Sequence, residues 1–292
     1  MTTAIPDRPA SGRMEPSWKA PPGLHLAWML GWNDCTVMFR SRMILMFVIV
    51  VPLAMVLITG LAFKGLEPQM SRAAQQPSRL PGKTAGKTGF SPPAAHFDSF
   101  TQAVTGNGVL FILLNCVMSG GMGLAQEKRR NTLDRLMVSP MSRGSILLGK
   151  VLGLYLVGLL QAAVIFGFGV VVGVALGDVL GVVLVTLLFI LVGCSLGLMI
   201  AALARREENV QLIGGPVAMV MTALGGGLFP YSMSPPWMQK IALLFPTGWA
   251  MEAYHQLLWQ GKRWESVVGN LVVLAAFAAV FLAVGIRRLR WE

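Results

Sequence analysis

VLGVVLVTLLFILVGCSLGLMIAALA, residues 179–204, is a run of 26 residues without a charged side chain. A helix needs about 20 mostly apolar residues to cross the hydrocarbon core of a bilayer, so this run predicts a transmembrane helix. Five further uncharged runs, each of 21 residues or more, cover residues 43–63, 99–126, 151–177, 209–239 and 266–286. We therefore expect an all-α polytopic membrane protein with six transmembrane helices, at about 43–63, 104–125, 151–176, 179–203, 210–230 and 267–286.

Composition and charge agree with that architecture. Of the 292 residues, 54% are apolar and 13% are charged, against about 25% charged in a soluble globular chain. With both termini in the cytoplasm, the cytoplasmic segments hold 16 Lys and Arg and the external segments hold 8, which follows the positive-inside rule. This topology explains the net charge of +11 without a nucleic-acid partner. Residues 1–22 are polar and Pro-rich and are expected to form a disordered cytoplasmic tail before a membrane domain over 23–290, with no cleavable signal peptide.

Two Gly-Lys-Thr tripeptides, at 82–84 and 86–88, raise the question of a nucleotide site. A P-loop has the pattern G-x-x-x-x-G-K-[ST], which needs another glycine five residues before the glycine of the Gly-Lys pair. Here those positions are occupied by Pro77 and Pro81. The predicted topology places this segment outside the cell, so we expect no ATPase site in this chain. The cysteines are scattered without a CxxC pair and the three histidines lie in different loops, so no metal or catalytic site is expected.

Two segments outside the spans are predicted to lie at the membrane surface. Residues 23–42 are expected to form an interfacial helix with Trp28, Trp32, Phe39 and Arg40 at the lipid boundary, although an ordinary linker before the first span is the alternative. Residues 231–264 contain three prolines and four tryptophans. We expect two short re-entrant helices there, broken near Phe245-Pro246, the alternative being an aromatic cap that lies on the surface.

The cytoplasmic loop QEKRRNTLDRLMVSPMSRGSILLGK, residues 126–150, has its apolar residues at helical spacing. A short amphipathic helix of this kind suits docking into a groove on a soluble partner. A simple positive-inside anchor loop is the alternative, and it explains the arginines but not the apolar spacing. The six spans lack ionisable residues that an ion-coupled transporter would need, so energy for any transport must come from a partner.

These segments together resemble the membrane subunits of ABC type-2 exporters. The resemblance is carried, in the order of that family, by Glu127-Lys128, Thr132-Leu133, Leu136, Ser139-Pro140 and Gly149-Lys150, with the segments 39–52 and 235–257. The chain departs from the family pattern at Asn131, where a glycine is usual, and at Asp134, where a glutamate is usual. The resemblance extends over about residues 23–290.

The resemblance implies a permease that works with two cytoplasmic ATPase subunits, which bind ATP and magnesium, and with a second permease copy or a paralogue. It implies a bacterial or archaeal cytoplasmic (inner) membrane location with both termini cytoplasmic. The implied coupling residues are Glu127, Arg129, Thr132, Leu133, Arg135, Leu136 and Pro140. The implied external gate consists of Phe229, Pro230, Trp237, Phe245 and Pro246. The uncharged spans favour a hydrophobic or amphipathic cargo such as a drug or lipid, while a membrane scaffold that moves no cargo is the alternative.

Overall fold

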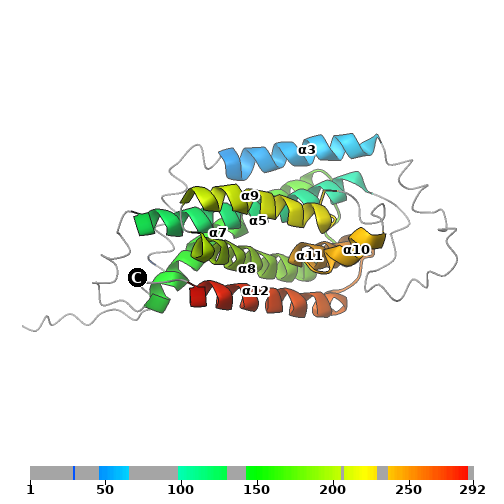
Figure 1. Cartoon of the computed structure of the whole chain (residues 1–292). Helices are drawn as coiled ribbons and strands as arrows, with labels where there is room; N and C mark the ends of the chain where they lie inside the picture. Colours follow the sequence, from blue (N-terminus) through cyan, green and yellow to red (C-terminus); the bar gives the residue numbers. More distant parts are fainter. Residues whose placement is uncertain are drawn as a thin grey trace, which may run out of the picture.

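The computed structural model describes residues 29, 46–65, 98–129, 143–204, 207–228 and 236–288. Within these ranges every regular element is helical, which confirms the all-α prediction (Figure 1). The elements are the π-helix η1 (Met46–Val50), α3 (Val51–Lys64), α5 (Ser99–Arg129), α7 (Arg143–Val171), α8 (Val179–Leu203), α9 (Glu207–Leu224), α10 (Pro236–Ala242), α11 (Pro246–Tyr254), the π-helix η3 (His255–Trp259), the 3₁₀-helix η4 (Trp264–Val267) and α12 (Val268–Arg288). The Gly-Lys-Thr repeats and residues 1–22 lie outside the described part of the chain.

Four of the described helical segments are long and apolar enough to cross a membrane: Ser99–Gly120, Val151–Val171, Val179–Leu203 and Trp264–Arg288. The first expected span is present as the shorter apolar helix Val48–Lys64, with Pro52 in its first α-helical turn. The fifth is present as α9, which has 18 residues and contains Pro216. The number of six crossings therefore stays a prediction.

The predicted span boundaries hold best where a charge or a cap coincides with the helix end. α8 begins and ends at residues 179 and 203, as expected, because Asp178 caps its first turn. α7 ends at Val171 rather than near 176, because the chain turns at Gly173, whose φ of 98° lies in the left-handed region that favours glycine. α5 runs past the expected residue 125 to Arg129.

α8 forms the centre of the bundle. The contacts of α8 with α12 and with α5 are the two most extensive between any described elements. In Figure 1, α8 lies between these two helices. Val185, Phe189, Ile190 and Cys194 on this helix are fully buried. A helix that is apolar on every side is expected at such a central position.

The outer half of α5 differs from the other spans because it buries polar side chains. Asp98 caps the helix by accepting hydrogen bonds from the backbone nitrogens of Phe100 and Thr101, both at 3.3 Å. Asn107 Nδ2 donates to Thr59 Oγ1 on α3 at 2.8 Å. The buried polar residues of this half are Ser99, Thr101, Gln102, Thr105 and Asn107. Packing against other helices, rather than lipid, surrounds this part of the span.

Cys116 lies where α5, α7 and α8 meet, and glycines on both neighbours let the helices approach. A Cβ atom added at Gly193 would lie 2.9 Å from Cys116 Cβ, and one at Gly197 would lie 2.6 Å from the Cys116 carbonyl oxygen. From α7, a Cβ at Gly158 would lie 3.5 Å from Cys116 Sγ. Cys116 and Cys194 are free and buried, with their sulfur atoms 3.8 Å apart. Small residues at helix crossings are the usual means of close packing in membranes.

Candidate functional site

α5 and α7 are both longer than the hydrocarbon core of a bilayer is thick. α5 has 31 residues and α7 has 29, which at 1.5 Å per residue gives helices of about 46 and 44 Å. The hydrocarbon core is about 30 Å thick. Each helix is therefore long enough to extend past one boundary of the core, and the segment 130–142 between them lies outside the described residues.

The predicted coupling residues fall partly within this extension. Glu127 and Arg129 belong to the last turn of α5, so the helix of the span continues into the predicted loop without a break. Five of them lie outside the described residues: Thr132, Leu133, Arg135, Leu136 and Pro140. The predicted interfacial residues Trp28, Trp32, Phe39 and Arg40 also lie outside the described residues. Their assignments remain predictions.

The external segment before the last span is broken where the sequence predicted. α10 ends at Ala242 and α11 begins at Pro246, with Phe245 in an extended conformation at the N-cap. Proline suits the first turn of a helix because its missing N–H has no partner there in any case. The Trp249 indole nitrogen donates to the Leu243 carbonyl oxygen at 2.9 Å and holds the turn together. Re-entry of these helices into the bilayer stays a prediction.

Three of the predicted gate residues, Trp237, Phe245 and Pro246, lie in the described part of the chain. Pro246 is buried, and Phe245 is half-buried and packs against the main apolar core. Trp237 is 59% exposed and points to a different environment. Phe229 and Pro230 lie outside the described residues. The structure thus brings the two residues of the helix break into the bundle and leaves the tryptophan of α10 outside it.

Three polar contacts that the sequence did not reveal hold α11 in the bundle. Thr247 Oγ1 donates to the Met221 carbonyl oxygen on α9 at 2.5 Å. The hydroxyl groups of Tyr254 and Thr186, the latter on α8, lie 2.9 Å apart. Asn270 Nδ2 on α12 donates to the Trp249 carbonyl oxygen at 3.0 Å. α11 is therefore tied to three long helices, and a shift of any of them is transmitted to it.

The turn after α9 is wedged between α5 and α11. Gly226 has a φ of 87°, and its carbonyl oxygen accepts a hydrogen bond from Gln102 Nε2 of α5 at 3.1 Å. Gly106 of α5 lies directly against the Gly227 carbonyl, with no room for a Cβ atom. A Cβ at Gly225 would lie 2.5 Å from Thr247 Oγ1. This turn directly precedes Phe229 and Pro230 of the predicted gate, which lie outside the described residues.

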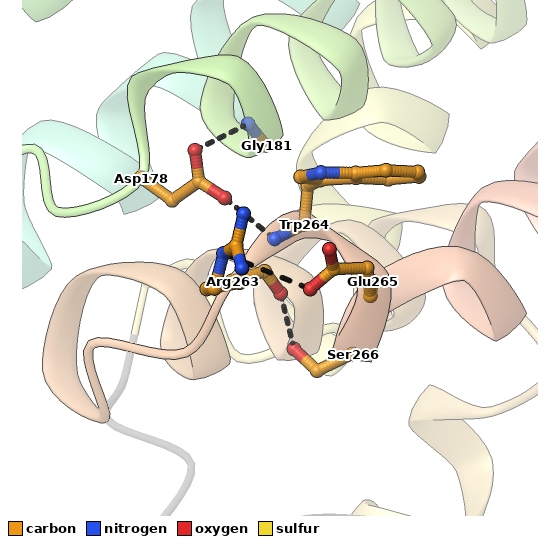
Figure 2. A network of polar contacts seen from close by, with 6 residues as sticks. All are labelled: Asp178, Gly181, Arg263, Trp264, Glu265 and Ser266. Carbon is orange, nitrogen blue, oxygen red and sulfur yellow. Dashed lines mark hydrogen bonds and ion pairs between the residues drawn. The ribbon is translucent and has the colours of Figure 1, made fainter.

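Asp178 links the loop between α7 and α8 to the start of the last span, as Figure 2 shows. One carboxylate oxygen accepts from Gly181 N at 3.5 Å and the other from Trp264 N at 2.6 Å. Beside it, the exposed Arg263 and Glu265 form an ion pair at 3.8 Å (Figure 2). The hydrogen bond from Trp264 N to Asp178 joins the loop before α8 to the start of η4. The exposed ion pair between Arg263 and Glu265 contributes little stability.

The π-helix η3 carries a histidine that is neutral at physiological pH. Burial, and secondarily the charge of Lys262, lowers the pKa of His255 from 6.5 to about 4. Its ring stacks on Trp259 with the ring centres 5.4 Å apart. One turn earlier, the buried Glu252 accepts a hydrogen bond from Gln256 Nε2 at 3.0 Å. Glu252 carries an ionisable side chain, but packed protein rather than solvent surrounds it.

In the middle of α5, one side of the helix is left half-buried by the other described helices. Leu114, Asn115, Met118 and Ser119 form this side, while Phe111, Ile112, Leu113, Cys116 and Val117 are buried. Ser119 Oγ donates to Asn115 Oδ1 at 3.0 Å. Polar side chains at membrane depth usually face protein or a water-filled path rather than lipid. This side of α5 is therefore the candidate surface for passage of a cargo.

α9 borders the same surface. A Cβ atom at Gly214 would lie 2.8 Å from Val117 Cγ1 and 3.6 Å from Met118 Sδ on α5. The opposite side of α9 carries exposed apolar residues, among them Leu212, Ile213, Met219 and Val220. The close contact at Gly214 thus places α9 beside Met118, while the exposed apolar side of α9 faces away from α5.

The relatives of this chain are transport permeases. Residues 66–287 match the model of the ABC-2 family transporter protein. The linearmycin resistance permease protein LnrN of Bacillus subtilis is 32% identical, over 72% of this chain and 55% of its own length. The inner membrane transport permease YhhJ of Escherichia coli is 26% identical, over 63% of this chain and 51% of its own length. The probable doxorubicin resistance permease DrrC of Mycobacterium tuberculosis is 28% identical, over 62% of this chain and 69% of its own length.

The family match covers most of the chain, from before α5 to the last turns of α12, although the chain spans about half the length of the first two relatives. It includes every element that forms the candidate surface and the predicted gate region. The chain belongs to the ABC-2 family of transporter proteins.

Proposed function

We propose that this chain is the membrane-spanning permease subunit of an ATP-driven exporter for a hydrophobic or amphipathic cargo. The observation that carries the proposal is the family match over residues 66–287, together with relatives named as permeases. The chain would work with two separate ATPase subunits, which bind ATP and magnesium, and with a second permease copy or a paralogue, in the cytoplasmic membrane of a bacterium or archaeon with both termini in the cytoplasm.

Coupling would run through the segment 127–140. Its beginning, at Glu127 and Arg129, continues α5 as one helix. A movement of a docked ATPase would therefore shift α5 itself, which contacts α3, α7, α8 and α9. Differential affinity of the ATPase for two arrangements of these helices is sufficient to drive the change. The length of α5 and α7, about 46 and 44 Å against a hydrocarbon core of about 30 Å, supports this role.

Docking is tested by co-purification of the permease with its ATPase from cells that express both. Leu133→Arg places a charge on the predicted apolar side of the docking helix, and we expect it to abolish co-purification while membrane insertion is unchanged. Ser142→Arg, in the same loop but beyond Pro140, is the matched control and should retain the ATPase. Equal recovery of the ATPase with Leu133→Arg and with the wild type would refute the docking assignment.

The cargo class is proposed from the half-buried side of α5. This side offers apolar residues and one hydrogen-bonding pair, Asn115 and Ser119, which fits a molecule with large apolar area and a few polar groups. The relatives named for resistance to linearmycin and doxorubicin support a drug-like cargo. The test is ATP hydrolysis by the complex in lipid nanodiscs with and without amphipathic compounds. Stimulation that Asn115→Leu weakens is the expected result, and a complex that no compound stimulates would favour the scaffold alternative.

A further inference from the structure

The side chain of Gln161, at the middle of α7, carries an acceptor that no described residue satisfies. Gln161 is the central residue of the candidate span Val151–Val171, and it is 1% exposed. Its Oε1 atom accepts no hydrogen bond from any described residue. By contrast, the buried amides of Asn107 and Asn270 both donate to oxygen atoms of neighbouring helices. An unpaired polar group at this depth is unfavourable, so a hydrogen-bond donor is expected to meet Gln161.

A second break in hydrogen bonding lies in the first expected span, at Pro52. Proline has no N–H, so the carbonyl group of Val48, four residues earlier, lacks its α-helical donor. The chain forms the π-helix η1 at this place, and its last residue, Val50, is followed directly by α3. Val48 and Pro52 are both buried. Lipid offers no donor, so membrane helices that proline interrupts rely on neighbouring side chains or ordered water.

The helices α3 and α7 run in the same direction. A Cβ atom at Gly60, near the end of α3, would lie 2.6 Å from Phe100 Cδ1 at the start of α5. A Cβ atom at Gly169, near the end of α7, would lie 3.0 Å from Val104 Cγ1, in the second turn of α5. Both helices therefore end beside the beginning of α5. Successive turns of α3 are thus matched by successive turns of α7.

One contact shows which residues of the two helices lie at the same level. Val48 of η1 and Val157 of α7 form a small buried cluster separate from the main core. Pro52 and Gln161 follow these two residues by four positions each, which is about one helical turn, so they lie on the same sides of their helices. α7 contacts both η1 and α3. The amide of Gln161 is thereby placed level with the break at Pro52.

We propose that Gln161 and the carbonyl group freed by Pro52 hold an internal water molecule between α7 and the start of α3. Gln161 Oε1 and the carbonyl oxygen are both acceptors, so neither satisfies the other, whereas a water molecule has two O–H donors and bonds to both. Buried waters in proteins bridge polar groups of this kind. The water would join the first expected span to α7. The inference goes beyond the proposed function because it depends neither on the cargo nor on the ATPase.

The first test compares thermal unfolding midpoints of four forms of the full-length protein in one detergent: the wild type, Gln161→Met, Pro52→Ala and the double variant. Methionine keeps the length of the glutamine side chain but accepts only weak hydrogen bonds, so it removes one end of the bridge. We expect Gln161→Met to lower the midpoint by about 2–4 °C. Alanine at position 52 supplies the missing N–H. In the Pro52→Ala background, Gln161→Met should therefore not lower the midpoint.

The sign of the shift separates the possible arrangements. If Gln161→Met raised the midpoint of the otherwise wild-type protein, the amide would be unpaired and the proposal would be overturned, because removal of an unsatisfied buried group is stabilising. An equal loss in both backgrounds would overturn it in favour of a partner of Gln161 that is unrelated to Pro52.

Hydroxyl-radical labelling tests the water directly and does not depend on the folding of Pro52→Ala. The full-length protein in lipid nanodiscs is irradiated with X-rays, and modified residues are identified by mass spectrometry. Radicals formed from a bound water modify the side chains beside it, so Pro52 should be labelled several-fold faster in the wild type than in Gln161→Met. Val56, which is fully buried one turn later on α3, is the control and should be labelled slowly in both. Equal labelling of Pro52 in the two proteins would overturn the proposal.

Discussion

The close helix crossing between α5 and α8 can be tested by adding a single methyl group. A Cβ atom at Gly197 would lie 2.6 Å from the Cys116 carbonyl oxygen and 3.1 Å from Val117 Cα. Both are backbone atoms of a buried helix, so neither can rotate aside. One turn earlier, a Cβ atom at Gly193 would lie 2.9 Å from Cys116 Cβ, so tilting α8 to relieve one contact would compress the other. Gly197→Ala therefore requires α5 and α8 to separate.

The expected size of the effect follows from two opposing contributions. Non-bonded atoms reach their optimum at about 3.5 Å, so the two helices must move apart by up to about 0.9 Å at this point. Overpacking of a core by such an amount costs about 1–3 kcal/mol. Alanine has a higher helix propensity than glycine, so the substitution also stabilises α8 by about 1 kcal/mol. Because both contacts are with backbone atoms that cannot rotate aside, we take the upper part of the overpacking range, about 2–3 kcal/mol, and expect a net loss of about 1–2 kcal/mol in the free energy of unfolding.

Gly167→Ala is the matched control, because a Cβ atom at Gly167 of α7 would meet nothing within 4 Å. The assay is the thermal unfolding midpoint of both purified variants in the same detergent. About 2–4 °C per kcal/mol is expected for a chain of this order of size, so Gly197→Ala should unfold about 2–8 °C below the wild type. Gly167→Ala should unfold at or above the wild-type temperature. A wild-type midpoint for Gly197→Ala, or an equal loss for Gly167→Ala, would refute the packing argument.

Three further predictions concern the outer end of the bundle. Tyr254→Phe removes the hydroxyl that meets Thr186 and should lower stability by about 1 kcal/mol, seen as a lower thermal midpoint; an unchanged midpoint would contradict it. Asp178→Ala removes the acceptor of Trp264 N and should speed hydrogen exchange at that amide, while an unaltered exchange rate would show that the link is dispensable. Because the pKa of His255 is about 4 in the folded state and 6.5 ordinarily, the unfolded state binds more protons in between. Stability should be full above pH 6.5 and fall toward pH 4, and His255→Gln should flatten this fall in a series of midpoints against pH; an equally steep fall in the variant would refute the assignment.

Particular residues show why part of this architecture could be predicted from the sequence. The bounds of α8 were predicted because Asp178 at one end and Arg205 beyond the other mark where an uncharged helix must stop. The break between α10 and α11 was predicted because Pro246 cannot continue a preceding helix. The end of α7 could not be predicted from the position of charged residues, because this helix ends within an uncharged stretch near Gly173. A helix end can be predicted from the local sequence only where a residue, such as a charge or a proline, prevents the helix from continuing.

The environment of the gate region could not be predicted, because it depends on contacts between distant parts of the chain. Tyr254 meets Thr186 across 68 residues of sequence, and Gln102 meets Gly226 across 124. Neither pairing has a local signature, so the burial of α11 within the bundle could not be predicted from its sequence. The assignment of Trp237 to the gate rests on its place in a motif and stays a prediction, and the exposure of its side chain could not be foreseen from that motif.

The polar outer half of α5 has a consequence for the order in which the protein is assembled in the membrane. Ser99–Gly120 is the least apolar of the four candidate spans and the one most buried by the rest of the protein, whereas α12 is the least buried. The partners of its polar residues include Gly226, which is synthesised more than 100 residues later. A newly made α5 would therefore enter lipid with unsatisfied groups, which are unfavourable there. Its stable integration must wait until the later helices emerge, so release from the insertion machinery is expected to be cooperative rather than span by span.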